Sequence, residues 1–122
     1  MTLPKLVYVV DDDEAVRDSM RVLLESCGME VRDYASAPDF LAQHDGAANA
    51  CLLLDIHMPG MSGLELLEVL REKNSQLPVI AITGRSDAAL RDRARLSGAF
   101  AVLDKPVSED VLLQSMKDAL AA

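Results

Sequence analysis

Carboxylates follow two separate apolar runs of this sequence. Asp11 to Glu14 (DDDE) come directly after Lys5–Val10 (KLVYVV), and Asp55 comes directly after Ala50–Leu54 (ACLLL). Carboxylates that are held close together repel each other unless a cation neutralises them or their pKa values rise. Oxygen-only ligands of this kind suit Mg²⁺, which keeps several waters and takes one or two protein carboxylates plus phosphate. If the fold brings the two runs together, these acids form a candidate Mg²⁺ site.

A hydroxyl and an ammonium group follow two further apolar runs. Thr83 follows Pro78–Ile82, and Lys105 stands just after Ala99–Leu103. Together with a divalent metal, such groups can stabilise the charge on a phosphoryl group that is transferred to or from Asp55. Singly, each position also fits a structural role, such as a helix cap, a hydrogen-bonded hydroxyl or a loop lysine. Their joint placement at the ends of apolar runs favours phosphoryl chemistry.

The elements that must position these groups alternate strictly along the chain. The predicted strands are Lys5–Val10, Met29–Asp33, Ala50–Leu54, Pro78–Ile82 and Ala99–Leu103. The predicted helices follow them in turn: one from about Asp13 to Gly28, one that Ser36 can cap, and then Leu64–Lys73, Ser86–Ser97 and Ser108–Leu120. This alternation predicts an α/β fold in which helices cover both faces of a parallel sheet.

For five such units the common doubly wound order is 2-1-3-4-5, that of the flavodoxin-like fold. Sites in these sheets lie beyond the carboxyl ends of the strands, where the winding reverses between strands 1 and 3. The acids at 11–13 and Asp55 follow those two strands. The order therefore predicts that they meet at one edge of the sheet.

Length and composition exclude several classes of protein. The 122 residues, of 13.2 kDa, predict a single domain over 1–122. A net charge of −8 argues against direct nucleic-acid binding. No apolar run reaches the ~18 residues of a membrane span, and the N-terminus lacks the features of a signal peptide. Cys27 and Cys51 have no histidines at metal-binding spacing, so we expect buried, reduced thiols in a cytoplasmic protein.

Four segments together resemble those of bacterial response-regulator receiver domains, the phosphoacceptors of two-component signalling. They read VVDDDEAVR (Val9–Arg17), LLLDIHMPGMSGLELL (Leu52–Leu67), AITG (Ala81–Gly84) and LDKP (Leu103–Pro106). The match runs essentially end to end, and the combined spacing is highly specific. Within the family, the chain is most similar to receivers that precede helix-turn-helix output domains.

The resemblance implies a role for each acid of the candidate site. Asp55 would be phosphorylated, and Asp12 would bind Mg²⁺ directly, with Asp11 binding it directly or through water. The backbone carbonyl of His57 would be a further metal ligand, so its imidazole need not be one. The side chains of His44 and His57 have no ligand set or nucleophile beside them, so we expect both to be exposed or packed without a catalytic role.

The resemblance also implies how the phosphoryl group is held. Thr83 would donate a hydrogen bond to it, Lys105 would pair with it, and the small Gly84 would leave it access. One position departs from the family pattern, because Val102 stands where many members carry a rotating Tyr or Phe. Phe100 lies two residues upstream, where strand alternation predicts the same face. The departure puts the usual coupling between the threonine and an aromatic side chain in doubt.

The partners implied are a sensor histidine kinase and an output domain or protein. The output would bind the surface of the fourth helix, the fifth strand and the last helix. Four arginines gather near that helix, at 85, 91, 93 and 95. They fit either a solvated helix face or a docking surface for an acidic partner.

Two other functions compete with that of a phosphoacceptor, which is not an enzyme in the usual sense. A Mg²⁺-dependent phosphohydrolase could use Asp55 as its nucleophile. Such enzymes usually carry a second carboxylate two residues later and a substrate cap, whereas His57 stands at that position and no cap segment is evident. A binding module that is never phosphorylated is the other alternative, and the complete set of acids, Thr83 and Lys105 disfavours it.

Overall fold

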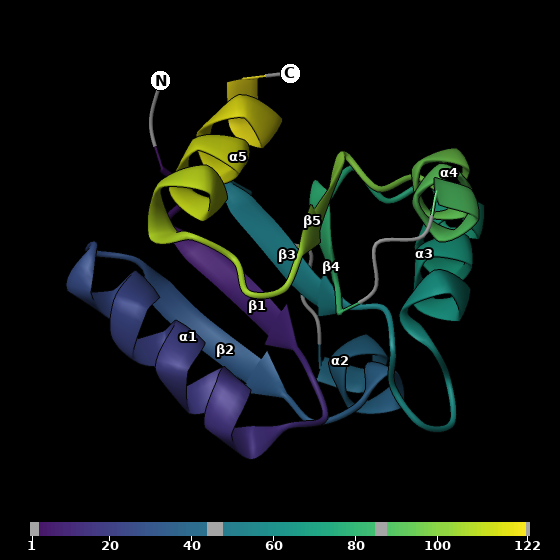
Figure 1. Cartoon of the computed structure of the whole chain (residues 1–122), viewed down its shortest axis with the longest axis horizontal. Helices are drawn as coiled ribbons and strands as arrows, with labels where there is room; N and C mark the ends of the chain where they lie inside the picture. The colour runs from purple at the N-terminus through teal and green to yellow at the C-terminus, as the bar shows by residue number, and fades with distance from the viewer. Residues whose placement is uncertain (1–2, 44–47, 85–87, 122) are drawn as a thin grey trace.

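The computed structural model describes residues 3–43, 48–84 and 88–121. Within them, five strands form one parallel sheet in the order β2-β1-β3-β4-β5, as Figure 1 shows. The strands are β1 (Leu6–Val10), β2 (Glu30–Tyr34), β3 (Ala50–Asp55), β4 (Val79–Thr83) and β5 (Ala101–Asp104). The predicted doubly wound order is confirmed, and β1 and β3 are neighbours.

A helix follows each strand, also as predicted. The helices are α1 (Glu14–Ser26), α2 (Ala37–Gln43), α3 (Gly63–Glu72), α4 (Ala88–Leu96) and α5 (Glu109–Ala121). Most boundaries lie within two residues of those expected from apolar spacing. Ser86, the expected start of the fourth helix, lies outside the described residues, as do His44 and Arg85.

Two apolar clusters hold the helices against the two faces of the sheet. On one face, alternate residues such as Tyr8, Leu52 and Ala81 pack under α2, α3 and α4. On the other face, Val9 and Leu53 belong to the cluster under α1 and α5. Figure 1 shows the same division, with α1 and α5 on one side of the sheet. Because both faces are covered, the central strands are apolar along their whole length and their first polar residues come at their ends.

Side-chain caps fix where two of the helices next to the predicted site begin. The Asp13 carboxylate accepts hydrogen bonds from the backbone N–H groups of Ala15 and Val16 at the start of α1. At α3, Ser62 and Glu65 form a reciprocal capping box. Such caps satisfy N–H groups that have no partner within the helix. Asp13 is thereby assigned to the helix, which leaves Asp11 and Asp12 for the sheet edge.

The start of α3 lies unusually close to the end of β3. Gly63 donates its backbone N–H to the carbonyl of Ile56 at 3.1 Å. A Cβ atom at Gly63 would lie 2.6 Å from the Asp55 carbonyl oxygen and 2.7 Å from the Ile56 Cα atom. Both contacts are with backbone, which cannot rotate away. Gly63 therefore allows the loop between β3 and α3 to close tightly behind Asp55.

The two cysteines differ in burial. Cys51 is the second residue of β3 and is fully buried, and burial raises the pKa of its thiol to about 12. Cys27, the residue after α1, is only partly buried. Both thiols are free, as expected, but the prediction that both are buried is wrong for Cys27, because a residue at a helix end is covered on one side only.

No helix in the described part of the chain is both long enough and apolar enough to cross a bilayer.

We predict that Gly63→Ala lowers the free energy of unfolding by about 1–3 kcal/mol, because the added methyl group must displace backbone atoms of β3. Chemical denaturation measures the change. Gly84→Ala is the matched control, since a Cβ there meets no described atom within 4 Å, and its effect should stay within about 0.5 kcal/mol. Equal effects of the two substitutions would show that the approach of α3 to β3 does not constrain the fold.

Candidate functional site

The register of the sheet places the predicted site residues at one edge. Val10 pairs with Leu54 and Asp55 pairs with Ile82. The next residue of the first strand, Asp11, therefore stands beside Asp55 across the β1–β3 ladder. Thr83 is the last residue of β4, and Lys105 follows the end of β5. The carboxyl ends of four neighbouring strands thus carry the acids, the hydroxyl and the lysine, as the sequence predicts.

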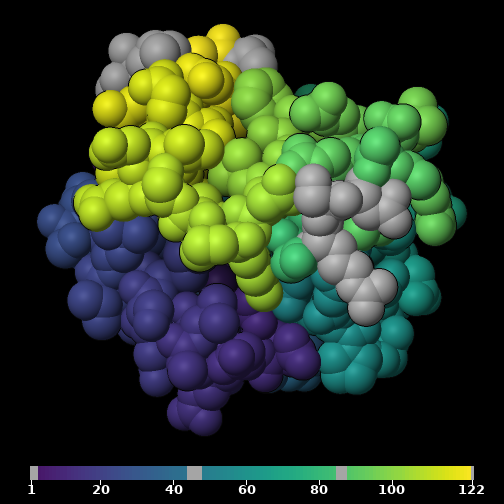
Figure 2. Space-filling view, viewed as in Figure 1, coloured from purple at the N-terminus to yellow at the C-terminus, as the bar shows by residue number. Residues whose placement is uncertain are grey.

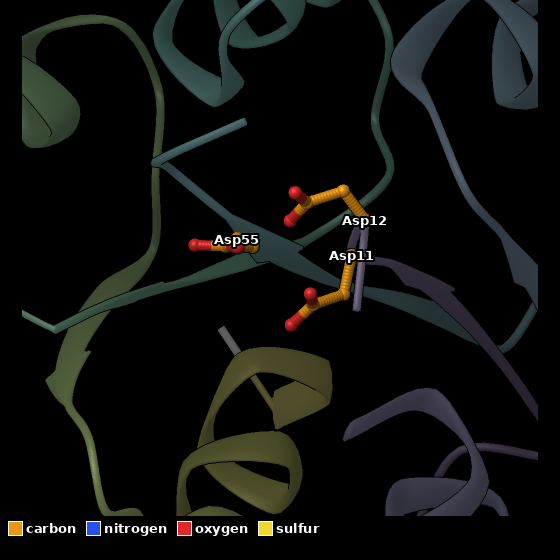
Figure 3. A group of neighbouring side chains, drawn as sticks. All are labelled: Asp11, Asp12 and Asp55. Atoms are coloured by element: carbon orange, nitrogen blue, oxygen red, sulfur yellow. The ribbon is translucent and has the colours of Figure 1, made fainter. Parts of the chain in front are cut away.

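Three carboxylates converge at this edge. Each of Asp11, Asp12 and Asp55 offers a ligand oxygen, and these oxygens all lie within 4.8 Å of one another. Figure 3 shows the side chains of Asp11 and Asp12 reaching toward the side on which Asp55 lies. Asp11 and Asp55 are buried, whereas Asp12 is exposed. The cluster is open to solvent on the side of Asp12.

A lysine stands beside two of the three carboxylates. Lys105 Nζ lies 3.7 Å from Asp11 Oδ2 and 3.6 Å from Asp55 Oδ2. One cation offsets part of the negative charge of three acids, and these two separations are longer than a direct hydrogen bond. Lys105 reaches the cluster because the backbone continues past β5, where its N–H donates to the Thr83 carbonyl at 2.8 Å.

Hydrogen bonds hold the backbone of the acidic segment. Asp11 Oδ1 accepts from the backbone N–H of Asp13 at 2.9 Å, and the Asp11 carbonyl accepts from Arg17 Nη1 at 2.7 Å. Arg17 Nε also lies 3.3 Å from Asp33 Oδ2, and Asp33 pairs with Arg21 at 2.5 Å. Arg17 therefore ties the end of β1 to both α1 and β2. Sequence reasoning missed this contact, because nothing in the spacing of Arg17 indicates a backbone acceptor.

The environment of Asp55 opposes its ionisation. Burial raises the pKa of its carboxyl group, and the nearby charges of Asp11 and Asp12 raise it further. The backbone N–H of His57, which donates to Asp55 Oδ1 at 3.1 Å, and the charge of Lys105 lower it by less. Beside the cluster lies a cavity of about 400 Å³ with a largely apolar lining that includes Leu53 and Ile82. The site therefore favours the binding of a proton or a cation at Asp55.

We predict that Asp55→Asn stabilises the metal-free fold at pH 7 by on the order of 1 kcal/mol, because it removes a buried charge and keeps the acceptor for His57. The folded pKa of Asp55 is raised, so its contribution to stability is complete below the unfolded pKa of about 4 and is lost as pH rises through the folded pKa. The advantage of the variant should therefore grow from pH 4 to pH 7.

Denaturation in EDTA at a series of pH values measures this difference. Asp18→Asn is the matched control, since it changes the net charge equally at an exposed position of α1. An advantage for Asp55→Asn that is constant with pH would contradict the raised pKa.

Thr83 lies at the same edge but bonds to a side chain to which the sequence analysis gave no role, the imidazole of His57. Thr83 Oγ1 lies 2.9 Å from Nε2 of His57, and Thr83 is fully buried while His57 is exposed. The expectation that the His57 imidazole is exposed is confirmed, but it contacts a residue of the predicted site. Sequence spacing could not place this contact, because it depends on the path of the loop after β3.

Comparison with known proteins decides the family. The model of a family described as the response regulator receiver domain matches residues 7–117. The chain belongs to this family.

The receiver is similar to several transcriptional regulators and to solved receiver structures. It is 40% identical over 115 residues to the transcriptional regulatory protein TdiR of Thauera aromatica, covering 94% of this chain and 51% of TdiR. It is 37% identical over 120 residues to FixJ of Bradyrhizobium diazoefficiens, covering 98% and 58% of the two chains. The chain therefore spans about half the length of these curated relatives.

Two of the similar solved structures combine the same fold with a related sequence. The structure titled FixJ-N superposes with a TM-score of 0.89 at 34% identity, covering 98% of this chain and 96% of that one. The structure of the response regulator StyR superposes with a TM-score of 0.88 at 40% identity, covering 97% and 60% of the two chains.

The last strand of the receiver differs from the expected arrangement around its switch position. Val102 is buried within the cluster under α2, α3 and α4. Phe100 precedes β5 and is 42% exposed, so it is not part of the core, and its place on the face of Val102 stays a prediction. Arg91 of α4 instead bonds the Val102 carbonyl and pairs with Asp104. A charged pair thus links α4 to β5 beside the buried valine.

Proposed function

We propose that this chain accepts a phosphoryl group from a sensor histidine kinase onto Asp55 and passes the signal to an output domain or partner protein. The observation that carries the proposal is the convergence of Asp11, Asp12 and Asp55 with Lys105 beside them. A phosphoryl group on Asp55 would add negative charge to this cluster, and a bound divalent cation together with Lys105 would stabilise that charge. The family to which the chain belongs supports the same function.

Mg²⁺ is the cofactor that this donor set fits. The side chains of Asp11, Asp12 and Asp55 would hold it, all of them oxygen donors. The backbone carbonyl of His57 would be a further ligand, and Asp11 would bind directly or through water. When bound, the metal neutralises carboxylate charge and the charge of the phosphoryl group. The net charge of the cluster with Lys105 alone is −2 if all three acids are ionised, so a divalent cation balances it.

The chain's own residues supply the remaining chemistry. A carboxylate oxygen of Asp55 attacks phosphorus, and the bond from phosphorus to the donor breaks as the aspartyl-phosphate forms. The backbone N–H of His57 orients the Asp55 carboxylate through its bond to Oδ1. Lys105 pairs with the transferred group, Thr83 donates a hydrogen bond to it, and Gly84 leaves it room.

The competing functions gain no support from the site. An aspartyl-nucleophile phosphohydrolase usually carries a carboxylate two residues after its nucleophile, whereas the residue there is His57, whose side chain bonds to Thr83. A module that is never phosphorylated has no need for three acids and a lysine at one sheet edge.

Incubation with acetyl phosphate and Mg²⁺, followed by intact-mass measurement, tests the proposal. We expect one added phosphoryl group per chain in the wild type and none in Asp55→Asn, since the amide lacks the nucleophilic oxygen. Turnover of varied phosphate esters would favour the phosphohydrolase instead. An unchanged mass in the wild type would favour the binding module.

We predict that Mg²⁺ raises the thermal stability of the wild type and not that of Asp12→Ala. A ligand at ten times its Kd adds about 1.4 kcal/mol to the free energy of unfolding. Asp13→Ala is the matched control, because it removes the neighbouring acid but retains the proposed ligands. It should lose stability through its missing helix cap while keeping the full increment from Mg²⁺. Equal increments in wild type and Asp12→Ala would refute the assignment of Asp12.

We propose that the signal leaves through the surface formed by α4, β5 and α5. Figure 2 shows the segment from β5 through α5, in yellow-green to yellow, as a continuous surface that borders the green of α4. Exposed apolar side chains lie along these elements, at Leu96, Phe100 and Val111. Arg93 and Arg95 are exposed, whereas Arg91 is paired with Asp104, so of these three described arginines the first two favour an acidic partner.

The proposed function also implies where the domain acts and what it does not bind. Residues 1–122 act as one receiver domain in the cytoplasm, where a kinase and acetyl phosphate can reach it, and without binding nucleic acid directly. The receiver releases its phosphoryl group by hydrolysis and turns over no other substrate.

A further inference from the structure

One residue contacts both the proposed phosphoacceptor and the proposed phosphoryl hydrogen-bond donor. The backbone N–H of His57 donates to Asp55 Oδ1 at 3.1 Å, and its Nε2 atom lies 2.9 Å from Thr83 Oγ1. His57 is exposed, whereas Thr83 is fully buried. The imidazole therefore covers a buried hydroxyl from the solvent side.

The fold separates this hydroxyl from the carboxylate. Along β3, Asp55 stands two residues after Leu53, which belongs to the cluster under α1 and α5. Along β4, Thr83 stands two residues after Ala81, which belongs to the opposite cluster. Because side chains repeat every second residue along a strand, the two side chains leave the sheet on opposite faces. The Thr83 hydroxyl must therefore shift toward the carboxyl edge before it can reach a phosphoryl oxygen on Asp55.

The bond to His57 opposes that shift. In one imidazole tautomer the threonine O–H donates to Nε2, and in the other Nε2–H donates to the hydroxyl oxygen. In either case the bond fixes the position of Oγ1, and movement toward Asp55 stretches it beyond hydrogen-bond length. The bond is present in this structure, and a shift of Thr83 toward Asp55 would break it.

We infer that His57 is a positioning residue that restrains Thr83 and so holds the receiver in its unphosphorylated arrangement. The inference rests on the proposed function, in which Thr83 donates a hydrogen bond to the phosphoryl group. An interaction made in one of two states shifts their populations by its differential strength. The bond to His57 therefore raises the free energy that the movement of Thr83 costs, and so opposes the phosphorylated arrangement.

Beryllofluoride with Mg²⁺, an analogue of the phosphoryl group, provides the test. The Kd is measured by NMR titration or calorimetry for the wild type, His57→Leu and His57→Gln. A net side-chain hydrogen bond is worth about three- to ten-fold in an equilibrium constant, so His57→Leu should bind the analogue that much more tightly. His57→Gln, whose amide can remake the bond to Thr83, should return toward the wild-type value.

A double-mutant cycle separates this role from a general effect of position 57. In a Thr83→Ala background, His57→Leu should no longer change the Kd, because its proposed partner is gone. Equal or weaker binding by His57→Leu in the otherwise wild-type protein would overturn the inference. So would an unchanged gain in the Thr83→Ala background. Thermal melting checks that each variant is folded, and exposed His57 gives no reason to expect unfolding.

The outcomes also separate this inference from the proposed function. If the wild type neither binds beryllofluoride nor accepts a phosphoryl group from acetyl phosphate, both are wrong. If the wild type does both and His57→Leu binds with the wild-type Kd, the restraint alone is wrong. A tighter Kd that depends on Thr83 supports both.

Discussion

Electrostatic repulsion between carboxylates at the end of the sheet is the constraint to which the rest of the site responds. It arises from the ladder itself, because pairing of Val10 with Leu54 leaves Asp11 and Asp55 side by side. Lys105 lies near both acids, and Arg17 donates a hydrogen bond to the backbone carbonyl of Asp11. Burial and the charges of Asp11 and Asp12 keep the pKa of Asp55 raised, although Lys105 lowers it. The folded protein therefore favours the binding of additional positive charge beside Asp55.

The core is what allows such a site to exist. The strands beneath it are buried on both faces by two apolar clusters, and that burial is the dominant favourable contribution to folding. Polar groups come only where the strands leave the core. The close approach of Gly63 to the backbone of Asp55 and Ile56 adds a second constraint on where the carboxylate can lie. Stability and function therefore occupy different parts of the same strands.

The sequence predicts the sheet and most of its functional edge for a simple reason. Buried parallel strands are continuous apolar runs, so their ends are visible as the first polar residues, and the order of a doubly wound sheet places those ends together. Contacts that depend on loop paths or long side chains were not predictable. Three examples are the bond between His57 and Thr83, the hydrogen bond from Arg17 to the Asp11 carbonyl, and the exposure of Phe100. Each depends on atomic positions that residue spacing does not determine.

The placement of the two cysteines gives the molecule a pair of built-in chemical probes. Cys51 lies in β3, four residues before Asp55, fully buried and with a pKa raised to about 12. The thiolate is the nucleophile that attacks thiol reagents, so the buried Cys51 reacts when β3 opens locally and exposes it. Cys27 is partly exposed at the end of α1 and serves as an internal reference. The labelling rate of Cys51 against Cys27 therefore reports local opening of the strand that carries the phosphoacceptor.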